Sequence, residues 1–165
     1  MDHGNIEKTK AWYENDYKQS GFKAQRLYPN EELLRFFGRN LFHLSPEQRR
    51  QTKVLEAGCG SCSNLWMCAH EGFDAYGLDL SEESLKLGQM RLDQRNVNAQ
   101  LVYASMTEMP FEDGSMDVVL DVFSGYCLIP SDYEIFISEA HRVLKKGGLF
   151  FLYTPSVEKI GRAHV

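Results

Sequence analysis

The sequence has few residues of the kinds that mark unusual protein classes. Five of its 165 residues are proline and 13 are glycine, which is too few for a low-complexity or collagen-like chain. The N-terminus, MDHGNIEKTK, lacks the apolar stretch of a signal peptide, and no apolar run approaches the roughly 18 residues that a membrane span needs. The chain has only four cysteines, Cys59, Cys62, Cys68 and Cys127. We therefore expect no disulfide framework and a place in the reducing cytoplasm.

Basic residues are fewer than acidic residues in this sequence. Lysine and arginine number 18 against 23 aspartate and glutamate residues, which gives a formal net charge of −5. Nucleic acids and anionic membranes both bind cationic surfaces, so we expect neither as a partner. The apolar share of 43% and the charged share of 25% are typical of a globular protein. The length suits one domain.

The first fifty residues are predicted to be helical. Residues 5–22 mix aromatic and charged side chains, and we interpret them as one or two short helical turns lying on a domain. Asn30 can cap a helix whose first turn is acidic, and apolar residues at helical spacing continue that helix to Phe42. Residues 46–53 are interpreted as a polar linker.

From residue 53 onward, short apolar strands alternate with helices. The predicted strands are 54–57, 75–78, 100–103, 116–120 and 149–154. Ser81 is predicted to cap one helix, Ser131 and Glu134 to form a capping box for another, and Gly147-Gly148 to end it. This alternation is typical of a doubly wound, Rossmann-like α/β fold with a parallel sheet and helices on both faces. Ligands of such sheets bind at the carboxyl ends of the strands.

A glycine-rich loop and an acid lie at those strand ends. The first predicted strand leads into the segment EAGCGSCSN, residues 56–64, whose glycines allow a ligand to approach the backbone closely. The N-terminus of the next helix would offer N–H groups to a carboxylate or phosphate. Asp79 ends the second strand, where an acid can accept hydrogen bonds from ribose hydroxyls. Together these features indicate a site for an adenosine-bearing cofactor.

Four segments in this order resemble the class I S-adenosylmethionine-dependent methyltransferases, and among them the small-molecule enzymes: VLEAGCGSCSN, YGLDLS, MPFEDGSMDVVL and HRVLKKGGLFFLYTP. The resemblance implies strand order 3-2-1-4-5, an N-terminal helical cap over residues 1–52 and a cofactor-binding core over residues 53–159. It also implies S-adenosylmethionine as the cofactor. The reaction would be in-line methyl transfer to an O, N or C atom of a small-molecule acceptor such as a sugar or another metabolite.

The family pattern assigns cofactor contacts to particular positions. Glu56, Gly58, Cys59 and Gly60 would hold the methionine part, with the Glu56 carboxylate near the ammonium. Asp79 would bind the ribose. The remaining expected contacts are Leu80 on one adenine face, Ser105 and Met106 in the adenine-binding turn, and Asp121 beside the methionine group.

Two positions depart from that pattern, and no catalytic base stands out. Cys62 replaces the third glycine of the loop, and we expect it to crowd the carboxylate end of the cofactor if its φ is positive. Ser105 replaces the usual acid, although its hydroxyl can still accept from an exocyclic amine. Asp121 and Tyr126 are candidates for a catalytic base by position alone.

Three other interpretations stay open. Cys59-x-x-Cys62 could be a redox or metal site, although zinc would need a second ligand pair at matching spacing, so we expect no metal. An NAD-binding domain shares this strand pattern but would carry glycine where Ser63 stands. A nucleoside-binding module of the same fold, without methyltransferase activity, is the third alternative.

The end of the sequence carries an expectation of its own. Members of the family continue beyond the fifth strand with an antiparallel hairpin that completes the sheet. Residues 160–165, IGRAHV, match the translation of a common sequencing adapter. We therefore expect a non-native tail, a chain cut before its final hairpin, and a polypeptide that by itself lacks activity although its parent is an enzyme.

Overall fold

The computed structural model describes residues 4–155. In chain order the elements are α1 (Gly4–Ser20), the 3-10 turn η1 (Gly21–Ala24), α2 (Glu31–Asn40), α3 (Pro46–Gln51), β1 (Lys53–Ala57), α4 (Leu65–His70), β2 (Asp74–Asp79), α5 (Glu82–Gln94), β3 (Gln100–Tyr103), β4 (Met116–Val122), the 3-10 turn η2 (Gly125–Cys127), α6 (Pro130–Val143) and β5 (Leu144–Tyr153). Residues 160–165, the expected non-native tail, lie outside the described residues.

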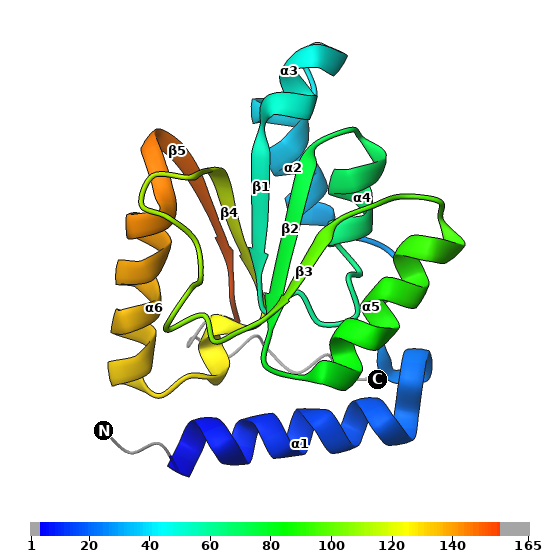
Figure 1. Cartoon of the computed structure of the whole chain (residues 1–165), viewed down its shortest axis with the longest axis vertical. Coiled ribbons are helices and arrows are strands. Elements are labelled where there is room, and N and C mark those ends of the chain that lie inside the picture. Colours follow the sequence, from blue (N-terminus) through cyan, green and yellow to red (C-terminus); the bar gives the residue numbers. More distant parts are fainter. Residues whose placement is uncertain (1–3, 156–165) are drawn as a thin grey trace, which may run out of the picture.

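The five strands form one parallel sheet in the order β3-β2-β1-β4-β5. Successive side chains of a strand point to opposite faces, so each central strand contributes to two cores. Val54 and Val118 face the core beneath α2, α4 and α5, whereas Leu55 and Val119 face the core beneath α6. Figure 1 shows α6 on one side of the sheet and the other three helices on the opposite side. The predicted fold class and strand order are confirmed.

Two predicted helix starts have the expected caps. The Asn30 side chain accepts hydrogen bonds from the backbone N–H groups of Glu32 and Leu33 at the start of α2. The Ser81 hydroxyl accepts from the N–H of Ser84 at the start of α5. These bonds satisfy amides that have no partner within the helix.

Two N-terminal predictions are wrong. Residues 5–22 were expected to form short turns, but α1 is a single helix of 17 residues, because no proline or glycine interrupts it before Gly21 at φ +52°. Residues 46–53 are not only a linker, because α3 begins with a capping box between Ser45 and Gln48. The Ser-Pro-x-Gln signal for that helix was present in the sequence.

Two predictions around α6 are also wrong. The helix begins at Pro130, and no side chain caps it at Ile129. Ser131 and Glu134 therefore lie inside the helix and form no capping box. Gly147 and Gly148 do not end α6 but lie within β5, opposite a register shift between Met116 and Val118 of β4.

The carboxyl ends of the strands share one edge of the sheet, and α1 lies across that edge (Figure 1). This places the loops after β1, β2 and β4 between the sheet and α1 (Figure 1). None of the helices within residues 4–155 combines the length and apolar character that a membrane crossing requires.

Candidate functional site

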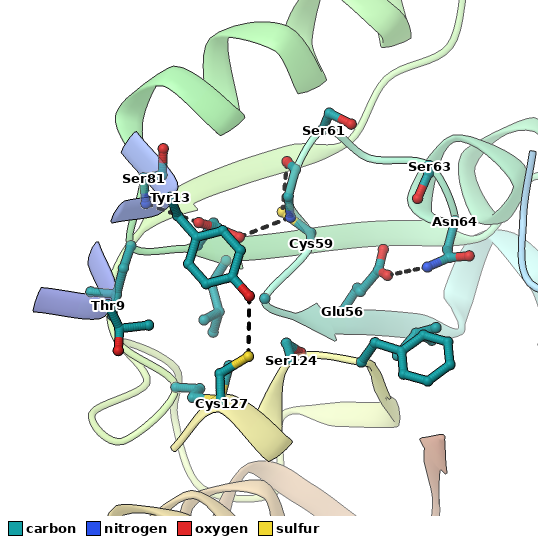
Figure 2. Close-up of a pocket in the computed structure, with 18 of the residues that line it drawn as sticks. Thr9, Tyr13, Glu56, Cys59, Ser61, Ser63, Asn64, Ser81, Ser124 and Cys127 are labelled. Carbon is teal, nitrogen blue, oxygen red and sulfur yellow. Dashed lines mark hydrogen bonds between the residues drawn. The ribbon is translucent and has the colours of Figure 1, made fainter. Parts of the chain in front are cut away.

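A cavity of about 570 Å³ lies between α1 and the carboxyl ends of the strands. This volume is within the usual range for a small-molecule site. The loops after β1, β2, β3 and β4 contribute to its walls, and Figure 2 shows the polar side chains that point into it. The expected cofactor residues that line it are Glu56, Gly58, Cys59, Gly60, Asp79, Leu80 and Met106.

Two glycines of the loop after β1 are required by its geometry. Gly58 and Gly60 have φ values of +68° and +51°, which side chains rarely tolerate. A Cβ atom on Gly58 would lie 2.6 Å from the Ser124 Oγ, and one on Gly60 would lie 2.6 Å from the Tyr17 hydroxyl oxygen. The backbone of this loop is therefore bare toward the cavity.

Cys62 does not crowd the site as expected. Its φ is +59°, the condition under which crowding was predicted, but its fully buried side chain is not among those that line the cavity. The thiol points toward α5, where a Cβ atom on Gly88 would come within 2.6 Å of the Cys62 Sγ. The absence of a side chain at Gly88 thus accommodates the departure at residue 62.

Glu56 presents an unsatisfied carboxylate oxygen to the cavity. The residue is 2% exposed, and its Oε1 accepts a 2.7 Å hydrogen bond from the Asn64 side chain (Figure 2). Its Oε2 has no partner among the described residues. Burial raises the pKa of Glu56 to about 8, and the nearby Asp121 and Asp79 add to the rise. In the empty site the carboxyl therefore holds its proton near neutral pH, and a cation bound beside Oε2 would favour the ionised form.

Ser61 supplies a second unsatisfied polar atom in the same wall. It is 2% exposed, and its hydroxyl has no partner within the described part of the chain. Buried polar groups are nearly always hydrogen-bonded, so two buried polar atoms without partners in the lining of one cavity indicate a place for a polar ligand. The helix end expected here is farther away, because α4 begins only at Leu65.

Asp79 joins the two loops at the centre of the site. One carboxylate oxygen accepts a 2.8 Å hydrogen bond from the Gly60 N–H, and the other accepts a 2.9 Å bond from the Ser81 N–H. Burial raises the pKa of Asp79, and these backbone bonds oppose that rise. Each oxygen keeps a second lone pair with which to accept from a ligand hydroxyl.

Helix α1 forms the roof of the cavity. Tyr13 makes a 3.1 Å hydrogen bond with Cys127 (Figure 2). Glu14 accepts a 2.5 Å bond from the Ser81 hydroxyl, which attaches the roof to the first turn of α5. Burial raises the pKa values of Tyr13 and Tyr17 well above that of a free phenol, so both hydroxyls stay protonated at neutral pH.

Two expected site residues, Ser105 and Asp121, have surroundings that limit their roles. Ser105 does not line the cavity, and its hydroxyl is bonded to Thr107 at 2.6 Å. Asp121 is fully buried outside the lining, and it accepts bonds from Ser124 and Gly125. Its geometry therefore suits it to hold the turn after β4 and not to act as a base.

Tyr126 does line the cavity, but its chemistry is not that of a base. The residue is 52% exposed. Its neighbour Cys127, and burial to a lesser degree, raise the pKa of its phenol. The hydroxyl therefore stays protonated near neutral pH and can donate a hydrogen bond.

Among residues 4–155, no three His, Cys, Asp or Glu side chains converge as a metal site would require.

Several residues of the site were not found from the sequence. Asn64 and Ser61 line the cavity, and their polar side chains in the loop after β1 were the available signal. Glu14 and Arg26 belong to the N-terminal segment, where no motif distinguishes them from solvent-exposed charges.

Comparison with known proteins shows that most of the strand-and-helix core matches a known protein family. A model described as "Methyltransferase domain" matches residues 54–148. The demethylmenaquinone methyltransferase of Geobacillus stearothermophilus is 36% identical over 104 residues, covering 59% of this chain and 42% of that protein. The enzyme of the same name from Listeria welshimeri is also 36% identical over 104 residues, covering 61% and 43%. The chain thus spans less than half the length of these curated relatives.

Solved structures agree on the fold. One comes from a study of the conversion of a disulfide bond into a thioacetal group during echinomycin biosynthesis. It has a TM-score of 0.73 at 18% identity and covers 87% of this chain and 57% of its own. A putative S-adenosyl-L-methionine-dependent methyltransferase from Methanococcus maripaludis gives 0.57 at 19%, covering 73% and 60%.

Proposed function

Because the chain belongs to the methyltransferase domain family, within the class I S-adenosylmethionine-dependent methyltransferases, we propose that its cavity binds S-adenosylmethionine. We further propose that the protein directs the methyl group of this cofactor to a small-molecule acceptor. The likeness to demethylmenaquinone methyltransferases supports a small-molecule acceptor, such as a sugar or another metabolite. The atom that receives the methyl group would be O, N or C.

One observation carries the assignment of the cofactor. The unpartnered Glu56 Oε2 and the unpartnered Ser61 hydroxyl both belong to the cavity wall, beside a loop whose glycines leave backbone groups bare. A carboxylate can bind an ammonium, and a hydroxyl can donate to a carboxylate. The pair therefore complements the zwitterionic amino-acid end of S-adenosylmethionine.

The wall after β2 suits the nucleoside end. Asp79 keeps acceptor capacity for the two ribose hydroxyls, and Leu80 lines the cavity next to it. Ala104 and Met106, after β3, add apolar surface on the same side. A flat base packs well against such side chains.

The cofactor supplies a methyl group that is already activated on a sulfonium. The protein has therefore mainly to position the acceptor and exclude water. The roof formed by Tyr13 and Tyr17 and the apolar wall formed by Val122, Phe123 and Leu128 serve this purpose. With Asp121 buried and the phenol of Tyr126 protonated, we assign no catalytic base to this chain.

Binding of S-adenosylhomocysteine, the demethylated product, tests the proposal by isothermal titration calorimetry. We expect Asp79→Asn to weaken binding by about 1–3 kcal/mol, as for the loss of hydrogen bonds to a charged acceptor. Asp74→Asn is the matched control, because Asp74 lies at the opposite end of β2 and does not line the cavity. Circular dichroism and thermal unfolding of both variants show whether they are folded.

The alternatives give different outcomes in the same experiment. NADH binding without S-adenosylhomocysteine binding would replace the proposal with a nicotinamide-binding module. Binding of S-adenosylhomocysteine without transfer of a labelled methyl group to any compound of a metabolite pool would leave a nucleoside-binding module.

A further inference from the structure

The cavity has two positive charges in its walls, and they lie at different places. Lys10 Nζ is 5.2 Å from the centre of the Tyr103 ring, at the end of β3. The Arg26 guanidinium is 4.8 Å from the centre of the Phe123 ring, which follows β4. In the sheet, β3 and β4 are separated by β2 and β1. Arg26 therefore lies on the side of the cavity away from the adenine-binding walls.

The Phe123 ring next to Arg26 has a fixed orientation. Phe123 has φ +60°, which is costly for an aromatic residue and persists only where the surroundings hold it. Its N–H donates a 2.9 Å hydrogen bond to the Tyr153 carbonyl, and its ring packs edge-on against Tyr153 and Tyr126. The Arg26 guanidinium thus lies over a ring that cannot easily rotate away.

The donor groups of Arg26 have no partner among residues 4–155. Within residues 4–155, its side chain makes no ion pair and no hydrogen bond. A guanidinium that stacks by its face keeps its N–H groups at its edge, where they match two oxygens of a carboxylate or phosphate. The acids that line the cavity, Glu56 and Asp79, are on the walls assigned to the cofactor.

Resting on the proposed function, we infer that the acceptor substrate carries an anionic oxygen group, a carboxylate or a phosphate, and that Arg26 binds this group from its place on Phe123. Arg26 lies on the β4 side, where the acceptor must approach the methionine end of the cofactor. An acid bound there is anchored at one end while its nucleophilic atom points into the cavity. Arg26 would thus determine which small molecules are accepted.

The test compares matched acidic and neutral probes of similar shape. The affinities of 4-hydroxybenzoate, 4-hydroxyphenyl phosphate and 4-hydroxybenzamide are measured by calorimetry, with S-adenosylhomocysteine at saturation. We expect one or both acids to bind at least about tenfold more tightly than the amide, since charge-assisted bidentate bonds are the stronger ones. The acid with the larger advantage distinguishes a carboxylate substrate from a phosphate substrate. Added salt should reduce this advantage, because Arg26 is exposed to solvent.

Two variants localise the effect. Arg26→Gln should remove the advantage of the acid over the amide, whereas Arg39→Gln, an exposed arginine of α2, should leave it unchanged. If the acids have no advantage over the amide in the wild type, or keep it in Arg26→Gln, the inference is wrong. The same comparison is run without S-adenosylhomocysteine. Failure of that compound to bind would refute the proposed function, while the comparison of probes would still decide the role of Arg26.

Discussion

The carboxyl group of Glu56 should make both stability and ligand binding depend on pH. Its pKa rises from 4.5 to about 8 in the folded chain, because burial penalises the charged form. Between these values the unfolded chain has released the proton and the folded chain still holds it. The free energy of unfolding therefore falls as pH rises through this interval.

The magnitude follows from the two pKa values. Each pH unit in which the folded and unfolded chains differ by one proton changes stability by about 1.4 kcal/mol. Between pH 6 and pH 8 the loss attributable to Glu56 is then about 2 kcal/mol. For a chain of this length this corresponds to a change in Tm of roughly 4–8 °C. Asp79 and Asp121, whose pKa values are also raised by burial, add to the pH dependence of any variant that keeps them.

Glu56→Gln isolates this contribution, because glutamine has nearly the same shape and does not ionise. We expect the stability advantage of the variant over the wild type to grow by about 2 kcal/mol between pH 6 and pH 8, as measured by thermal and urea unfolding. Glu108→Gln, which changes an exposed carboxylate, should show no such growth.

The same carboxyl group has the opposite effect on binding. An ammonium binds the ionised form, so S-adenosylhomocysteine should bind the wild type up to about 50-fold more tightly at pH 8 than at pH 6. Glu56→Gln should bind weakly at both values. If the variant binds as the wild type does, with the same pH dependence, then Glu56 does not hold the ammonium and the assignment of the cavity wall is wrong.

Further substitutions test the packing around the site. Gly88→Ala should destabilise the chain by about 1–3 kcal/mol in urea unfolding, because the new Cβ would lie 2.6 Å from the Cys62 Sγ. Adding Cys62→Ala should recover most of that loss, and no recovery would contradict the fit between the two residues. Asn30→Ala should lower stability by about 1 kcal/mol through loss of the α2 cap, and an unchanged midpoint would show that the cap contributes nothing. Glu14→Gln weakens the bond to the Ser81 hydroxyl and should speed tryptic cleavage within α1 while leaving cleavage elsewhere unchanged. Equal rates in the variant and the wild type would mean that this bond does not hold α1.

Much of the fold could be predicted because its signals are local. Alternating apolar runs marked the strands, and Asn30 and Ser81 marked helix starts whose caps are present in the structure. The wrong predictions around α6 arose where neighbouring residues indicated different positions for the start or the end of the helix. Pro130 begins α6 and leaves Ser131 inside the helix, and a register shift between β4 and β5 keeps Gly147 within the strand.

The site was predictable only in part, for a physical reason. The loop after β1 and the acid at the end of β2 are adjacent to strands that the sequence defines, so their meeting at Asp79 could be anticipated. The space beside Cys62 depends on Gly88, a contact between residues far apart in the chain. Contacts of that kind require three-dimensional placement and are not encoded in spacing.

The attachment of α1 has a consequence for the kinetics of ligand exchange. The helix lies over the mouth of the cavity and is tied through Glu14 to the start of α5, one loop away from Asp79. We expect a molecule inside to leave faster when that tie and the contact between Tyr13 and Cys127 are broken. Residence time should therefore depend on the attachment of the N-terminal helix as well as on the contacts that the ligand itself makes.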